Sequence, residues 1–172
     1  LNSPDALLSF LRLRPDFETG AVAVEARVWL RDPDFVMPYR IAYEGTPARY
    51  LTGADFDPES LQVIGGTVWI GEEFGPFLIS ATLDGVLTGV FPAVVEGAEI
   101  RSPDHPRVRA PAQPGQEFQA SRSAGFEGLA LQPGPGLLWA MLERPLIDDG
   151  PARRGRACAA AGSRGADGHR RS

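Results

Sequence analysis

The chain has 172 residues, with 22 acidic side chains against 17 basic ones, and every basic residue is Arg. Its length and its hydrophobic content of 43% suit one ordinary folded domain. The net charge of −5 argues against a nucleic-acid partner, and no apolar run is long enough for a membrane-spanning helix. A single Cys excludes an internal disulfide and a Cys-built zinc site.

The first apolar segment, residues 4–13, suits either a short helix or an early strand, because its periodicity does not separate the two. Residues 21–30 then place an apolar side chain at every second position from Val22 to Val28, which predicts a strand. Further short apolar runs bounded by Gly, Pro and Asp predict strands at 40–43, 61–64, 67–71, 77–82, 87–91, 129–132 and 137–142.

Glycine-bearing turns separate these strands in pairs. Gly65 and Gly66 lie between the runs at 61–64 and 67–71, and Asp84 and Gly85 lie between those at 77–82 and 87–91. Residues 133–136 (PGPG) make a longer turn of the same kind. Many short strands with tight turns and little helix indicate an all-β sandwich, barrel or propeller.

An internal repeat favours the propeller. Residues 56–73 (FDPESLQVIGGTVWIGEE) and 126–143 (FEGLALQPGPGLLWAMLE) share a Phe, an early acid, a turn with Gly, a Trp, and an acid four residues after the Trp. A recurring hairpin with Trp on its second strand is typical of propeller blades. Two unrelated hairpins are the alternative. Residues 97–122, rich in Pro and polar side chains, are expected to be an inserted loop.

Acidic residues gather at the ends of these predicted hairpin strands, where blades of a propeller converge on the central channel. Converging carboxylates repel one another unless a cation or a proton lies between them, and Ca²⁺ prefers oxygen ligands. Such an ion would hold a phosphate or polarise an ester and activate water. The alternative is that these acids are solvated turn residues or hydrogen-bond acceptors at strand ends. The acids concerned are Asp55, Asp57, Glu59, Glu72, Glu73, Glu127 and Glu143.

A second candidate group lies in the Pro-rich segment at residues 101–106 (RSPDHP). Asp104 precedes His105, and a His beside an acid can act as a general acid or base near neutral pH. A His in such a loop can equally be an ordinary surface residue. No Gly-x-Ser-x-Gly motif supports a serine hydrolase, and without Lys no Walker-type phosphate loop exists.

These segments resemble the phytase-like domain family, whose members are described as having esterase-like activity of phytase. The resemblance is carried by LTGADFDPESLQVIGGTVWIGEEFGPFLI (51–79), by RSPDHP (101–106) and by the second copy of the repeat (125–143). It implies a β-propeller, often in the periplasm or outside the cell, that hydrolyses phosphate or carboxylic esters of small molecules through Asp and Glu residues. Propeller phytases that depend on calcium are a more distant analogy.

From the residues and the resemblance together we assign roles to these groups. The expected catalytic residues are Glu72, Glu73, Glu127, Asp104 and His105, and the expected Ca²⁺ ligands are Asp55, Asp57, Glu59 and Glu143. The expected substrate is a small ester or phosphoester, with neither a nucleic acid nor a membrane as partner. The alternative is a non-catalytic propeller that binds a partner and uses the acids structurally.

The composition changes at residue 150. Residues 1–149 carry 11 Arg and 21 acids, whereas residues 150–172 carry six Arg, one acid and no large apolar side chain. We expect the second part to be a disordered Arg/Ala/Gly-rich tail, either a frameshifted or truncated end or a basic arm. Residues 1–149 are then expected to be an incomplete propeller of two to three blades that folds poorly alone.

Overall fold

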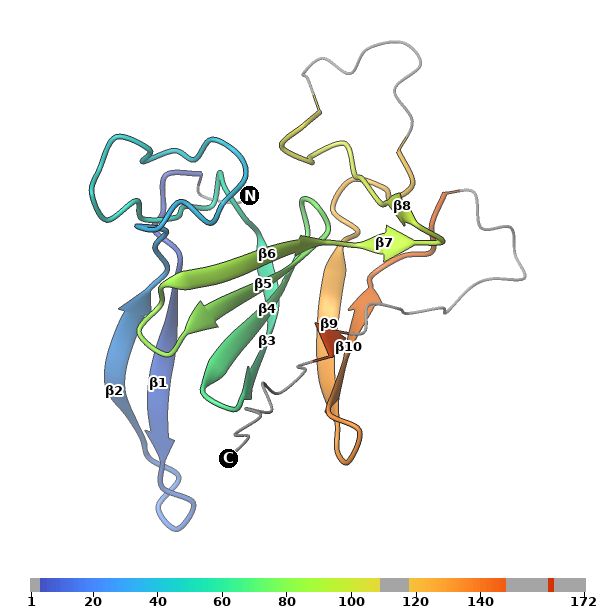
Figure 1. Ribbon diagram of the computed structural model, residues 1–172. Coiled ribbons are helices and arrows are strands. Elements are labelled where there is room, and N and C mark those ends of the chain that lie inside the picture. The colour runs from blue at the N-terminus through green and yellow to red at the C-terminus, as the bar shows by residue number, and fades with distance from the viewer. Residues whose placement is uncertain (1–3, 109–117, 148–160, 163–172) are drawn as a thin grey trace, which may run out of the picture.

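The computed structural model describes residues 4–108 and 118–147, together with the backbone of residues 161–162. Every regular element in these ranges is a β-strand, and the strands form small antiparallel sheets (Figure 1). The all-β prediction is therefore confirmed. The first apolar segment, which suited a helix or a strand, contributes strand β1 (Ser9–Pro15).

A four-stranded antiparallel sheet forms the centre of the fold. It consists of β3 (Pro58–Ile64), β4 (Thr67–Glu72), β5 (Phe77–Thr82) and β6 (Leu87–Pro92), which pair in chain order. Gly65 and Gly66 close the β3–β4 hairpin with φ values of 57° and 83°, a left-handed conformation that side chains with a Cβ rarely adopt. Four strands joined in chain order by tight turns are the form of one propeller blade.

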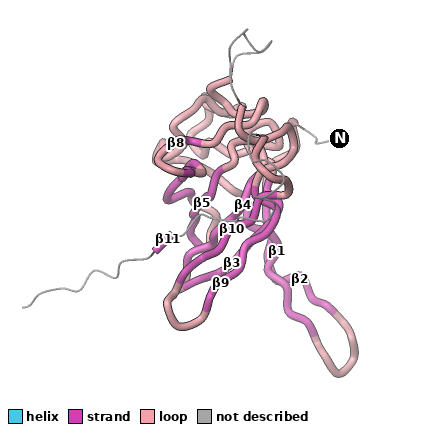
Figure 2. The backbone as a smooth tube through the Cα atoms, turned by 90° about the vertical axis from the view of Figure 1, so that its right-hand side faces the viewer, coloured by secondary structure: helices cyan, strands magenta, loops and turns pink. Residues whose placement is uncertain are grey.

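Smaller sheets flank this central sheet. On one side β1 pairs with β2 (Val22–Trp29), and on the other β9 (Phe126–Gln132) pairs with β10 (Leu137–Leu142) (Figure 1). The short strands β7 (Val94–Val95) and β8 (Ala98–Glu99) lead into the Pro-rich loop, and β11 (Ala161–Gly162) pairs with β10. In Figure 2 the β1–β2 hairpin extends away from the other strands.

One predicted strand is wrong. Residues 40–43 lie in an irregular loop of turns, although Ile41 is 6% exposed and belongs to the core. The backbone N–H of Ala42 is bound by the side chain of Asp55 and not by a neighbouring strand. The short apolar run therefore reflects a loop that faces the core, which sequence periodicity does not separate from a strand over four residues.

The central sheet is apolar on both faces, which explains why sheets lie on both sides of it. One core cluster, which includes Leu30, Leu51 and Ile70, lies between the central sheet, β1–β2 and the loop that follows β2. The other, which includes Leu78, Phe126 and Leu138, lies between the central sheet and β9–β10. Strands buried on both faces pack as inner layers of a larger assembly of sheets.

The outer flanks of this assembly remain open. Leu11, Leu13, Val22 and Val24 on the β1–β2 hairpin are 43% to 62% exposed. No sheet closes into a barrel within the described ranges, so the fold is that of an incomplete propeller. The expected boundary at residue 150 and the expected disorder of the tail lie outside the described residues, apart from the two residues of β11.

Among the residues that the structure describes, none forms a helix long and apolar enough to cross a membrane.

At Gly125 the segment that enters β9 lies close against the backbone that follows β4. A Cβ built at Gly125 would lie 2.4 Å from the carbonyl oxygen of Glu73 and 2.5 Å from its Cα. We predict that Gly125→Ala lowers the free energy of unfolding by about 1–3 kcal/mol through overpacking, as measured by urea denaturation. Gly45→Ala is the matched control, because a Cβ there meets nothing within 4 Å. Equal stabilities of the two variants would contradict this prediction.

Candidate active site

The β3–β4 and β9–β10 hairpins carry the same irregularity in the same place. In the first, Pro58 pairs with Glu72 and Ser60 with Gly71, so that Glu59 forms a β-bulge. In the second, Phe126 pairs with Leu142 and Gly128 with Met141, so that Glu127 forms the equivalent bulge. A bulge takes one residue out of the ladder and redirects its side chain. Both hairpins thus present a Glu at the start of their first strand.

The second acid of each hairpin is held in an equivalent way. The N–H of Glu73 donates to the carbonyl of Asp57 over 3.0 Å, and the N–H of Glu143 donates to the carbonyl of Gly125 over 2.9 Å. In each case the acceptor stands two residues before the bulged Glu. The repeat found in the sequence is therefore a structural repeat, and it brings one bulge Glu and one post-strand Glu to the same end of each hairpin.

These acids meet in one group, which we call the acidic cluster: Asp57, Glu59, Glu73, Glu127 and Glu143. Carboxylate oxygens of Asp57, Glu59 and Glu73 lie within 4.8 Å of one another, and so do those of Glu73, Glu127 and Glu143. Glu73 is common to both sets and is 7% exposed, whereas Glu59 and Glu143 are exposed. The cluster is thus a row of carboxylates with Glu73 buried at its centre.

The electrostatics of the cluster follow from this crowding. The pKa of Glu73 is raised to about 7, first by burial and then by the charges of Asp57 and Glu59, a hydrogen bond with Asp57 and the charge of Glu127. Burial also raises the pKa of Glu59, assisted by Asp57, Glu127 and Glu143. Like charges at this separation favour a proton or a cation between them. The donor set consists of oxygen atoms only, which suits a hard cation such as Ca²⁺.

Glu72, a predicted catalytic residue, is not part of this cluster. Its side chain is fully buried and accepts the backbone N–H groups of Phe74, Gly75 and Phe77 at 2.7 to 2.8 Å. Burial raises the pKa of Glu72 to about 8, although these N–H donors act in the opposite direction. Glu72 is the last residue of β4 and Glu73 lies in the bend that follows, so the two side chains are used differently.

Asp55, a predicted calcium ligand, is likewise engaged elsewhere. One of its carboxylate oxygens accepts the N–H of Ala42 over 2.8 Å, and the other accepts the N–H and the hydroxyl of Thr52 over 2.7 and 2.9 Å. Asp55 is 7% exposed and belongs to neither carboxylate set of the cluster. These contacts tie the loop that follows β2 to the segment that enters β3.

Asp104 and His105 do not pair with each other. The side chain of Asp104 forms an ion pair with Arg122. His105 is 1% exposed, its Nδ1 accepts the N–H of Arg107 over 3.0 Å, and its Nε2 lies 3.2 Å from a carboxylate oxygen of Glu99. Burial lowers the pKa of His105, while Glu99 opposes that shift.

Glu99 is a polar partner that the sequence did not reveal. It lies within ion-pair distance of Arg101 and Arg107 as well as of His105, at 2.7, 3.4 and 3.2 Å respectively. The ring of His105 also packs against Tyr39 and Phe77, with centroid separations of 5.6 and 5.1 Å. His105 is therefore part of the packing beneath the Pro-rich loop. In the sequence only the short separation of six residues between Glu99 and His105 hints at their contact.

The fold and the cluster define an all-β, propeller-like protein with a carboxylate-rich site. A family model described as Phytase-like, esterase-like activity of phytase, matches residues 1–169, and the chain belongs to this family. A search of the curated proteins and of the solved structures finds no significant match. Family membership indicates a hydrolase-like function on a small molecule, and the cluster supplies acidic groups suited to a metal ion.

The raised pKa of Glu73 predicts how stability depends on pH. Because the folded pKa of about 7 lies above the ordinary value of 4.5, the folded state binds more protons in this window and the free energy of unfolding falls as pH rises. In the presence of EDTA we expect the melting temperature to fall by roughly 3–6 °C between pH 5 and pH 8. Glu73→Gln should reduce the slope of this decline, and the remainder should come from buried Glu72, whose pKa is also raised, to about 8. An unchanged slope in the variant would refute the assignment.

Substitution of Glu72 should destabilise the protein, unlike substitution of Glu73. Glu72→Gln replaces one acceptor oxygen by an NH₂ group, so that a backbone N–H of the 74–77 turn is left facing a donor. We expect a loss of about 1–3 kcal/mol of unfolding free energy in urea titrations at pH 7. Glu73→Gln is the matched control, since it removes repulsion and should not destabilise the protein. A Glu72→Gln variant as stable as the wild type would contradict the hydrogen-bond assignment.

Proposed function

We propose that the acidic cluster is the active site of a hydrolase that cleaves carboxylic esters or phosphoesters of small molecules with the help of a divalent cation. The observation that carries the proposal is the convergence of carboxylates from two equivalent hairpins on the buried Glu73. Membership of the phytase-like family supports the reaction class. The proposed cation is Ca²⁺, because the donors are all carboxylate oxygens.

The residues of the cluster divide the work by position. Asp57, Glu59 and Glu143 would hold the cation together with Glu127, for which we expected a catalytic role from the sequence. The bound cation would supply positive charge to hold a phosphate or polarise an ester and to activate water. Glu73 lies between the two carboxylate sets and is shielded from solvent. Its carboxylate is the group we assign to accept and return the proton of the attacking water.

Four of the residues singled out in the sequence support the site from outside it. We infer that Glu72 positions Glu73 through the 74–77 turn, and that Asp55 fixes the approach to β3. Asp104 and His105 hold the Pro-rich loop, whose Ser102 donates its hydroxyl to the carbonyl of Phe74 over 2.5 Å. These four are positioning residues in the proposed mechanism.

The charge of the chain is consistent with a role for a cation. The sequence carries a net charge of −5, and the described cluster concentrates five carboxylates in one place. An anionic substrate such as a phosphate monoester would be repelled from this surface unless a metal reversed the local field. We also propose that the protein acts in the periplasm or outside the cell, as the family resemblance implies.

Hydrolysis and calcium binding can be tested together on the full chain. Glu73→Gln and Glu127→Gln should each lower kcat/KM for p-nitrophenyl butyrate or p-nitrophenyl phosphate by about 10²–10⁴-fold. Ca²⁺ should raise the melting temperature of the wild type and much less that of Glu127→Gln. Glu18→Gln is the control, because Glu18 lies in the exposed β1–β2 turn.

The outcomes separate the two readings of the cluster. Loss of turnover in both cluster variants, with normal turnover in Glu18→Gln, supports the hydrolase. A calcium-dependent rise in melting temperature without turnover of either substrate would instead identify a structural cation site in a non-catalytic binding module. If the protein shows no turnover and no calcium response, the proposed function is overturned.

A further inference from the structure

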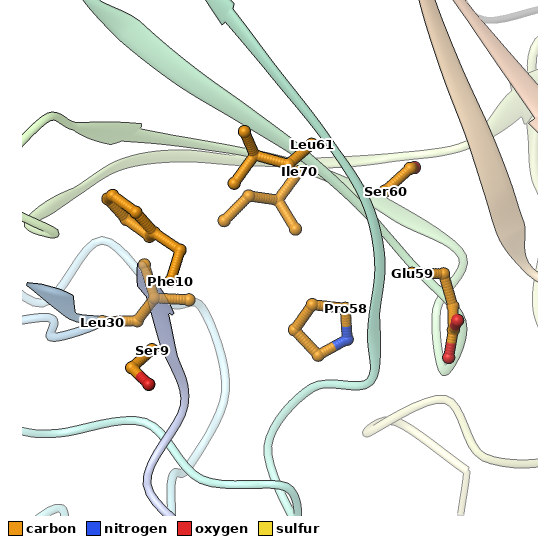
Figure 3. A pocket seen from close by; sticks show the side chains of 8 residues that line it. All are labelled: Ser9, Phe10, Leu30, Pro58, Glu59, Ser60, Leu61 and Ile70. Atoms are coloured by element: carbon orange, nitrogen blue, oxygen red, sulfur yellow. The ribbon is translucent and has the colours of Figure 1, made fainter. Parts of the chain in front are cut away.

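A small pocket lies between the β1–β2 hairpin and the central sheet, on the opposite face of the sheet from β9–β10 (Figure 3). Its volume is about 220 Å³. Most of its wall is hydrocarbon, and its polar lining residues are two serines and one glutamate. The lining residues are Ser9, Phe10, Leu30, Pro58, Glu59, Ser60, Leu61 and Ile70.

The pocket runs from the core to the surface. Leu30 and Ile70 at its inner wall are 3% and 2% exposed, whereas Leu61 is 43% exposed. Phe10 and Leu30 face Leu61 and Ile70 across the pocket in Figure 3. A ligand can therefore enter past Leu61 and bury apolar surface without disturbing the strands.

One residue, Glu59, belongs both to the pocket lining and to the acidic cluster, and β3 runs between the two. Its carboxylate belongs to the set with Asp57 and Glu73. The bulge at Glu59 takes this residue out of the β3–β4 ladder, and in Figure 3 its side chain lies across β3 from Phe10. Pro58 and Glu59 thus form the boundary between an apolar cavity and a row of carboxylates.

We propose that this pocket binds the hydrocarbon part of a carboxylic ester whose reacting group lies at the Glu59 end, beside the acidic cluster. The proposal rests on the proposed hydrolase function and specifies its substrate class. The pocket volume equals that of about seven liquid waters, which suits a chain of about four to six carbons. A phosphate ester of a polyol would leave this apolar surface unused.

The chain-length dependence of hydrolysis tests the proposal. For the wild type we expect kcat/KM to rise about fourfold for each added methylene. The rise should appear either from p-nitrophenyl acetate to the hexanoate, if the pocket holds the acyl part, or from methyl to hexyl acetate, if it holds the alcohol part. A flat profile in both series would overturn the proposal.

Leu61→Trp fills the pocket from its exposed rim and should reduce the hexanoate-to-acetate ratio, or its hexyl-to-methyl counterpart, by roughly tenfold or more. Val63→Trp is the matched control, because Val63 is 55% exposed on the same face of β3 and does not line the pocket. It should keep the profile of the wild type. A full chain-length dependence retained in Leu61→Trp would count against the pocket.

Binding of a neutral, non-hydrolysed probe separates this proposal from the proposed function. N-hexylacetamide should shift the backbone amide NMR signals of Phe10, Leu30 and Ile70 in the wild type and in Val63→Trp, but not in Leu61→Trp. Shifts without turnover of any ester would support the pocket and overturn the hydrolase. Turnover that depends on Glu73, with a flat chain-length profile and no shifts, would support the hydrolase and overturn the pocket.

Discussion

The side chain of Glu72 is the point on which the arrangement of the site depends. Its carboxyl group lies at the end of β4 and accepts three backbone N–H groups from the turn that leads into β5. Ser102 binds the same turn through the carbonyls of Phe74 and Gly75, so the Pro-rich loop is attached to it as well. A buried acceptor with three donors fixes a turn that no regular ladder would hold. Glu73, the next residue, takes its position from that turn.

Much of the fold could be predicted from the sequence because its strands are short, apolar and closed by Gly turns. The β3–β4 and β5–β6 hairpins follow directly from Gly65–Gly66 and Asp84–Gly85. The first residues of the strands were harder to predict. β3 begins at Pro58 and β9 at Phe126, each three residues before the apolar run that indicated it. In both, the missing residues include the bulged Glu, whose polarity disguises a strand position. The loop at 40–43 shows the reverse error, since Ile41 enters the core without a strand.

Part of the candidate site could also be predicted from the sequence. The repeat matched Glu59 with Glu127 and Glu73 with Glu143, and the structure brings these four together. The residues that stand outside the cluster sit next to those within it. Glu72 precedes Glu73, and Asp55 is two residues from Asp57. The side chains of Glu72 and Asp55 accept hydrogen bonds from nearby backbone N–H groups. Which of two neighbouring acids joins the cluster and which binds the backbone depends on turn geometry, and composition and spacing do not encode it.

The division of the cluster between two hairpins has a mechanical consequence. Asp57, Glu59 and Glu73 move with the central sheet, whereas Glu127 and Glu143 move with β9–β10. A cation bound by carboxylates of both groups would link the two sheets. Part of its binding free energy would then stabilise the packing of β9–β10 on the central sheet. Without it, repulsion between the two groups would work against the packing of Phe126 and Gly125 on the central sheet. The ion concentration of the surroundings would then set how firmly one sheet is clamped to the next.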